Sequence, residues 1–376
     1  VANGAEMTIT PEVIYSVING KMTIVGTGKI TNSGNVMLID KGMGNNAGFR
    51  TLTTAGLPKT DGGNFILKMY DTNLSNLRYG QLHFKNVFQY GVTGIVDKEY
   101  KDNHHGSYQQ IALPFSGKKL SELSTELLSS GHTFKFGAGN RANRYSGEAI
   151  MRYSNEYARF DNLAATDTNF FSGYFILGTK NFNASTTVKT IKGVPNSLVY
   201  TETIPAGGML SSDVVFGTGG KNQNFYRERY NTYIQDQWDA ATPWTGNFGK
   251  NLYLYGNPFL TNLDMINQLP QMTNNDILGL RLEPTSVTTS SGNGTQSAGA
   301  KQVTYTPGSP YSTPVGDVTA IIKPMQTFVL KFRNDNAHNV RFDQSIRFAF
   351  TARPHLLSPS VLSRGSAGSL KQLGVI

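Results

Sequence analysis

Hydrophobic and polar residues alternate along most of the chain, in short segments that end at turn residues. Clear examples are "EVIYSVI" at 12–18, "TFVLKF" at 327–332 and "SIRFAF" at 345–350. An alternation of period two places successive side chains on opposite faces of a β-strand, and Gly, Pro and Asn interrupt such strands. Many short strands separated by turns favour an all-β fold.

The first part of the chain, residues 1–95, is expected to form a small N-terminal β domain. Asn19-Gly20 lies between "EVIYSVI" and "KMTIVG" and is the preferred pair for a type I′ hairpin, because both turn positions need a positive φ. "GNFILKMYD" and "YGQLHFKNVF" predict a second strand pair. The sequence shows no repeat of constant length that would indicate a solenoid.

Residues 96–376 are expected to form the main domain, with a β-sandwich or jelly-roll-like arrangement. Strand patterns such as "SYQQIALPF", "SGYFILGT" and "QTFVLKF" follow one another with turn residues between them. This spacing is typical of sandwiches and jelly rolls. The polar stretch at 285–301 predicts a mobile surface loop.

One segment has a helical period instead of a strand period. In "SGKKLSELSTELLSSG", the leucines recur with the three- and four-residue spacing of a single helical face. The pattern predicts one short helix over 119–130, ended by Gly131 and covering one end of the sandwich. The leucines of this face are Leu120, Leu123, Leu127 and Leu128.

The stretch "NLYLYGNPFLTNLDMI" at 251–266 ends a strand abruptly. Pro258 has no N–H for a β-ladder and biases Asn257 away from the helical region, so Gly256, Asn257 and Pro258 are expected to form a structural corner. Asp264 or Asn262 is then expected to cap a short helical segment, "DMINQL", that blunts the sheet edge.

The same stretch carries a family resemblance. "NLYLYGNPFLTNLD" resembles the "GNPYPSALD" segment of large cell-surface proteins of Bacteroidota, many of them exported by the type IX secretion system. "IIKPMQTFVLKF" is similar to the family's "IAPGQGFFVK" strand pair, and "VRFDQSIRF" to its "FNNSMR" strand. The resemblance covers residues 95–350, with Phe259 at the family's Tyr and Thr327 at its Gly. It implies an extracellular, surface-attached β-sandwich.

Amino-acid composition and charge exclude several classes of protein. The chain has no cysteine, which excludes disulfides, thiolate zinc sites and thiol catalysis. Its formal charge of +9 comes from scattered Lys and Arg, so nucleic-acid binding is not expected as a physiological role. No apolar run approaches the length of a membrane-spanning helix. The start at Val1, without Met or an apolar leader, suggests a mature form of a secreted protein.

Candidate chemistry is sparse, and we expect neither an enzyme nor a cofactor or metal. The histidine pair His104-His105 lies near Asp97, Glu99 and Asp102, but adjacent strand histidines point to opposite faces and cannot chelate one ion. Glycoside hydrolysis needs two carboxylates across a groove. The carboxylates available have no distinctive spacing: Glu148, Glu156, Asp161 and Asp239.

Aromatic residues concentrate in "NFYRERYNTYIQDQWDAATPW" at 224–244. Tyr230, Tyr233, Trp238 and Trp244 could stack on sugars or contact a protein partner. The alternative is a long loop whose aromatic residues pack onto the sandwich.

Three functions remain open from the sequence. The first is an extracellular structural or adhesive protein of the outer cell surface, such as a filament, surface-layer or gliding-apparatus subunit. Its partners would be copies of itself, other surface proteins, or acidic or neutral polysaccharide. A further hypothesis is that subunits assemble by strand exchange, with residues 1–18 filling a gap in a neighbour; the alternative is that the missing strand belongs to the same polypeptide. The second is a glycan-binding module of a larger secreted protein, and the third a secreted hydrolase.

Overall fold

A computed structural model describes the backbone of most of the chain. The described residues are 1–10, 13–40, 48–60, 64–68, 80–85, 92–93, 96–101, 108–137, 147–185, 188–197, 200–209, 224–227, 252–265, 277–282, 286–290, 294–296, 301–304, 315–316, 321–334, 336–342 and 371–375. They contain many strands and a single helix, so the predicted all-β class is confirmed.

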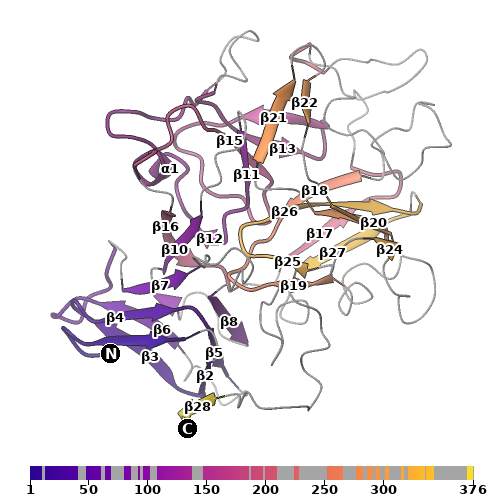
Figure 1. The fold of residues 1–376 in the computed structure, drawn as a ribbon. Helices are drawn as coiled ribbons and strands as arrows, with labels where there is room; N and C mark the ends of the chain where they lie inside the picture. Colours follow the sequence, from indigo (N-terminus) through magenta and orange to yellow (C-terminus); the bar gives the residue numbers. More distant parts are fainter. Residues whose placement is uncertain are drawn as a thin grey trace.

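The first ten strands form a three-sided parallel β-helix (Figure 1). Each strand from β1 to β7 pairs in parallel with the strand three places later. Strands β1, β4, β7 and β10 therefore share one sheet, β2, β5 and β8 a second, and β3, β6 and β9 a third. The strands are β1 (Glu6–Ile9), β2 (Val13–Ile18), β3 (Lys21–Val25), β4 (Lys29–Asn32), β5 (Asn35–Ile39), β6 (Gly48–Leu52), β7 (Phe65–Lys68), β8 (Gln81–Lys85), β9 (Val92–Thr93) and β10 (Val96–Lys101).

Apolar residues at matching positions of successive coils fill the interior of the β-helix. In the second sheet Val17 aligns with Leu38, and Leu38 with Phe84; all three are buried. A polar row lies beside this stack, where Gln81 donates a hydrogen bond to Asn35 over 2.8 Å. Parallel stacking therefore repeats one environment from coil to coil.

Two local predictions for this region are wrong. Asn19 does adopt a positive φ of 55°, but β2 and β3 belong to different sheets, so Asn19-Gly20 forms a corner and not a hairpin. β7 and β8 likewise do not pair with each other. The solenoid itself was not expected. Residues that stack on one another in successive coils are separated by different lengths of chain: Glu6 pairs with Lys29, but Asn35 pairs with Gln81. Coil length therefore varies, and the sequence shows no repeat of constant length.

The β-helix continues directly into the rest of the molecule. β10, which extends past the expected boundary at residue 95, pairs antiparallel with β16 (Val188–Pro195), and β16 pairs with β12 (Phe115–Ser116). The edge of β8 is met by the backbone of another segment, since the Leu82 N–H donates to the Leu260 carbonyl over 3.1 Å. One hydrophobic cluster contains residues of both regions, including Ile9 in the β-helix and Leu123 in α1.

The predicted helix is present but shorter than expected. α1 spans Glu122–Leu127, and Leu128 is already extended, so the helix ends before Gly131. The leucines of the predicted face are all buried: Leu120, Leu123, Leu127 and Leu128. The helix packs against β16, at the junction with the β-helix.

The chain after β10 forms a second unit, which contains two antiparallel sheets. Their strand orders are β14-β13-β15-β11-β21-β22 and β18-β26-β20-β23-β24. They share a buried cluster that includes Met151 and Tyr153 from the first sheet and Leu254 and Val329 from the second. Whether this arrangement is a sandwich or jelly roll stays a prediction. The strands of these sheets are β11 (Tyr108–Ile111), β13 (Ile150–Ser154), β14 (Arg159–Asn162), β15 (Phe175–Gly178), β18 (Leu252–Gly256), β20 (Ile277–Leu282), β21 (Ser286–Ser290), β22 (Gly294–Gln296), β23 (Lys301–Thr304), β24 (Val315–Gly316) and β26 (Thr327–Phe332).

Three smaller pairings complete the described fold. β17 (Tyr200–Ile204) pairs with β27 (His338–Phe342), and β19 (Leu263–Asp264) with β25 (Ile321–Ile322). β28 (Lys371–Val375) pairs in parallel with β2.

Three expectations change with these pairings. The stretch at 285–301 contains the β21–β22 hairpin instead of an irregular loop. Residues 263–264 are a strand, so Asp264 belongs to a strand and not to the predicted helical segment; Met265 is helical, and the rest of the predicted segment, 266–269, lies outside the described residues. Residues 1–18 form the first coil of their own β-helix, with Ile9 and Val17 buried, and are not a free segment for donation to a neighbour.

Candidate functional site

The hairpin of β13 and β14 presents two arginines on one face. In its register Arg152 lies opposite Asp161, and Ser154 opposite Arg159. Residues directly opposite one another, and residues two apart in a strand, share a face, so these four side chains lie together. The residues of the other face are buried in the core: Met151, Tyr153 and Phe160.

The tip of this hairpin is fixed to the neighbouring sheet. Ala158 takes a positive φ of 45° and closes the turn between the strands. The side-chain amide of Asn155 donates to the Leu254 carbonyl over 3.2 Å, and the Leu254 N–H donates to the Asn155 Oδ1 over 2.9 Å. This two-point contact holds the hairpin on β18, so the arginine face has a rigid support.

Arg159 is surrounded by aromatic rings. Its Nε donates to the Asp161 Oδ1 over 2.7 Å, and its Cζ lies 4.7 Å from the Tyr157 ring centroid. Two further rings approach from a tight turn at 224–227: Tyr226 at 5.3 Å and Phe225 at 5.7 Å. Such distances fit cation–π contacts. Phe225 is 68% exposed, although it is a large apolar side chain.

Arg152 has a simpler environment. Its Cζ lies 4.5 Å from the ring centroid of Phe170, which is 44% exposed. The next residue, Phe171, turns inward and packs edge-on against Phe259 and Phe342. Within the part of the chain that the structure describes, Arg152 makes no ion pair.

We call this set the arginine–aromatic surface: Arg152, Tyr157, Arg159, Phe170, Phe225 and Tyr226. It combines guanidinium donors with exposed apolar ring faces on a rigid hairpin. Guanidinium groups bind carboxylate, sulfate or phosphate oxygens, and ring faces bind apolar surface. The arrangement is suited to binding.

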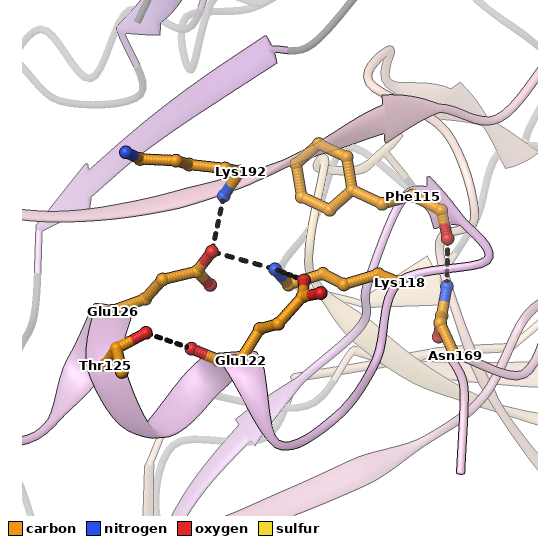
Figure 2. Close-up of polar contacts among 7 residues, drawn as sticks. All are labelled: Phe115, Lys118, Glu122, Thr125, Glu126, Asn169 and Lys192. Atoms are coloured by element: carbon orange, nitrogen blue, oxygen red, sulfur yellow. Dashed lines mark hydrogen bonds and ion pairs between the residues drawn. The ribbon is translucent and has the colours of Figure 1, made fainter. Parts of the chain in front are cut away.

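A second cluster is buried and joins α1 to β16. Lys118, whose side chain is 1% exposed, forms ion pairs with Glu126 at 2.8 Å and Glu122 at 3.2 Å. The Lys192 N–H also donates to Glu126 over 3.2 Å. Figure 2 shows the two glutamates reaching from one helix toward the Lys118 amine, with Lys192 on the opposite side. Asn169 donates to the Phe115 carbonyl over 2.6 Å and points away from that amine.

Burial raises the pKa of Glu126, and the neighbouring Lys118 ammonium partly offsets this. The Glu126 Oε2 is buried and has no hydrogen-bond partner among the residues that the structure describes. Because the ammonium is inaccessible and pairs with two carboxylates, the cluster joins α1 to the segments packed against it.

Two of the carboxylates considered from the sequence are held by cations. Glu148 pairs with Lys135 at 2.6 Å and Lys180 at 3.2 Å, and the hydrogen bonds from these lysines and Asn181 lower its pKa to about 2. Asp161 pairs with Arg159. A carboxylate stabilised in its ionised form is a poor general acid.

Glu156 lies at the exposed tip of the hairpin, where its hydrogen bond raises the pKa of Tyr157. Asp239 lies outside the described residues. The structure also contains a partly buried glutamate that sequence reasoning missed. Burial raises the pKa of Glu202, and a hydrogen bond with Tyr255 opposes that rise.

The structure places the predicted corner in the interior. Asn257 is fully buried, and its amide donates to the carbonyls of Thr261 and Lys323 over 2.8 and 3.0 Å. A Cβ added to Gly256 would overlap the Ala112 side chain and the Gly173 carbonyl oxygen. The Pro258 carbonyl accepts a hydrogen bond from Asn196 over 2.9 Å.

Other candidate residues fall outside the described part of the chain. These include the predicted contact residues Tyr230, Tyr233, Trp238 and Trp244, and the histidines His104 and His105 with Asp102. Asp97 and Glu99 lie in β10. Among the residues that are described, no group of three or more His, Asp or Glu could hold a metal ion, and no helix is long and apolar enough to span a membrane.

The arginine–aromatic surface was missed because its parts are distant in sequence. "MRYSNEYARFDN" shows arginines alternating with aromatic residues, a signal for outward-facing arginines on a hairpin. Nothing in the sequence joins that hairpin to Phe225. Comparison with known proteins adds no relative: no family model, curated protein or solved structure matches this chain.

Proposed function

We propose that this chain is an extracellular structural or adhesive protein of an outer cell surface, which acts by binding and not by catalysis. The observation that carries the proposal is the arginine–aromatic surface. Phe225 and Phe170 are exposed large apolar residues, and each lies against an arginine on one supported hairpin. Exposed aromatic residues of this kind mark contact sites when they gather on one face.

The titratable clusters support binding over catalysis. Lys118 is inaccessible and paired with Glu122 and Glu126, while Glu148 and Asp161 are each paired with a cation. Active sites instead keep an acid or base poised near neutral pH beside open space. The described clusters fit a scaffold whose ionic groups hold elements together.

The proposal includes kinship with Bacteroidota surface proteins exported by the type IX secretion system, and a sandwich arrangement of the second unit. Two stretches that carry the resemblance contact each other. β18 pairs with β26, and the Asn257 amide also donates to the Ile322 carbonyl in β25 over 3.2 Å. The motif residues thus support a common structural unit and not a ligand site.

The proposal is tested on intact cells of the source organism. A membrane-impermeant amine reagent should label the chain without lysis, and a strain lacking it should attach less to surfaces or to other cells. Complementation with the Phe225→Ala variant should restore the protein but not attachment. Labelling only after lysis, or unchanged attachment in the deletion strain, would overturn the proposal.

A further inference from the structure

We propose that the arginine–aromatic surface binds an acidic polysaccharide, with a uronate carboxylate at Arg152 and sugar rings stacked on Phe170 and Phe225. The inference rests on the proposed function only in taking the same surface as the contact site. It adds the chemical class of the ligand and assigns separate roles to the two arginines.

Arg152 is the group that receives the anion. The Cζ of its guanidinium lies over the Phe170 ring, 4.5 Å from the centroid, so the ring supports the cation on one side. A stacked guanidinium presents paired N–H donors that match the two oxygens of a carboxylate. Among the described residues no carboxylate neutralises Arg152, so its charge is complementary to an anionic ligand.

Arg159 has a positioning role. Asp161 already neutralises it at 2.7 Å, and its guanidinium lies under Tyr157, Phe225 and Tyr226. The cation therefore holds the 224–227 turn on the hairpin and orients the exposed ring of Phe225. Removing it should displace that ring, in addition to deleting a charge.

The rings provide the remaining contacts of a sugar chain. Phe170 and Phe225 have no hydroxyl group, so their exposed faces are wholly apolar and suit the C–H faces of pyranose rings. They approach Arg152 and Arg159 respectively, and those arginines lie on adjacent strands of one face. Diagonal neighbours across two strands are about 7–8 Å apart, so an extended chain can cross both positions.

The extent of the surface favours a polysaccharide over a folded protein partner. The described site consists of one hairpin, one loop residue and one turn. A stable protein interface buries about 800 Å² on each partner, whereas even a fully covered aromatic side chain supplies only about 150–250 Å². A thin anionic chain can be held by a few stacked rings and one guanidinium.

The test uses the full chain and two probes with the same backbone. Polygalacturonate carries a carboxylate on each sugar, and its fully methyl-esterified form carries none. Binding is measured by isothermal titration calorimetry near physiological salt, with circular dichroism to show that each variant is folded. The variants are Arg152→Gln, Arg152→Lys, Phe170→Ala and Phe225→Ala. The matched control, Arg50→Gln, removes the same charge from an exposed position on β6 of the β-helix.

The wild-type chain should bind polygalacturonate and not the ester. Arg152→Gln should weaken binding about tenfold or more, because it removes a charge-assisted contact. Arg152→Lys should recover only part of it, since an ammonium lacks the paired donors. Each Phe→Ala variant should weaken binding about fivefold through lost stacking. Arg50→Gln should bind as the wild type does.

Other outcomes would overturn the inference. Equal losses in Arg50→Gln and Arg152→Gln would mean attraction to the net charge of +9 alone. Equal binding of the ester would mean a neutral ligand, and no binding of either probe would exclude uronate chains. If attachment of cells still required Arg152 in that last case, a protein partner would replace the polysaccharide and the proposed function would stand. If the chain bound polygalacturonate but was not exposed on intact cells, the proposed function would fail alone.

Discussion

The β-helix and the second unit use strands of the same length in opposite ways. In the β-helix a strand never pairs with its sequence neighbour, and β1 finds its partner in β4. In the second unit sequence neighbours do pair, as β13 does with β14 and β21 with β22. A turn signal therefore has different meanings in the two regions: it marks a corner in the first and a hairpin in the second.

The cores of the two regions differ as well. The β-helix stacks apolar residues in rows, such as Val17 on Leu38 on Phe84. The second unit relies more on aromatic rings that meet edge-on, such as Tyr255 with Phe342 at 5.8 Å. A substitution in a row should disturb packing in the coils above and below it. A substitution in a cluster of rings should disturb only the sheets that form the cluster.

The largest expected effect comes from breaking the junction between the regions. Lys118→Met leaves Glu126 largely buried without its cation and should lower the free energy of unfolding by about 3–5 kcal/mol. Urea denaturation should then show two transitions, one for each region, because the ion-pair cluster that joins α1 to β16 is lost. The double variant Lys118→Met/Glu126→Leu should recover most of the loss. A single unshifted transition in Lys118→Met would show that the two regions do not depend on this ion pair.

A slightly smaller effect is expected inside the β-helix. Leu38→Ala removes a fully buried side chain from the middle of a row and should cost about 2–4 kcal/mol. Leu57→Ala is the control, because Leu57 is 64% exposed; it should change stability by less than about 0.5 kcal/mol. Chemical denaturation measures both. Equal effects of the two substitutions would contradict the row-packed interior.

The corner of the second unit should show an intermediate effect. Asn257→Ala leaves the carbonyls of Thr261, Ile322 and Lys323 without their buried donor and should cost about 1–3 kcal/mol. Binding per folded molecule should not change, and Pro258→Ala should behave in the same way with a smaller loss. Thermal denaturation with parallel binding assays checks this. Loss of binding at unchanged stability would make the corner part of a ligand site.

The smallest effect concerns pH, and its sign differs between two glutamates. The pKa of Glu148 is lowered to about 2, so its contribution to stability is present above the unfolded pKa near 4.5 and is lost as pH falls toward 2. The pKa of Glu126 is raised, so its ionised form opposes folding and stability rises as pH falls through that pKa.

Urea midpoints between pH 2.5 and 7 distinguish these signs. Glu148→Gln should destabilise the chain near neutral pH and have little effect at the acidic end of the range. Glu126→Gln should instead stabilise the chain near neutral pH, because the ionised carboxylate of Glu126 opposes folding there. If both variants changed the pH profile in the same direction, the assigned environment of one of these carboxylates would be wrong.

The sequence predicted those features that depend on neighbouring residues. The leucines of α1 repeat within a few positions, and the alternation at 252–256 marks a strand directly. The β-helix depends on pairings such as Asn35 with Gln81, which cross insertions of unequal length and leave no local signal. The arginine–aromatic surface was predictable only in part: Arg152 and Arg159 alternate with aromatic residues, which indicates that the arginines face outward. The contact of Phe225 with Arg159 depends on a chain path that no pattern encodes.

The pairing of β10 with β16 also sets the order in which the chain can fold. As a chain emerges from its N-terminus, β10 meets its parallel partner β7 long before β16 exists. The side chain of Gln81 accepts a hydrogen bond from the Asn262 N–H, and this contact can form only after residue 262 has been synthesised. Contacts between such distant residues form slowly, so the last coil of the β-helix remains incomplete for much of synthesis. The β-helix therefore gains its complete set of contacts only after β16 and Asn262 have been made.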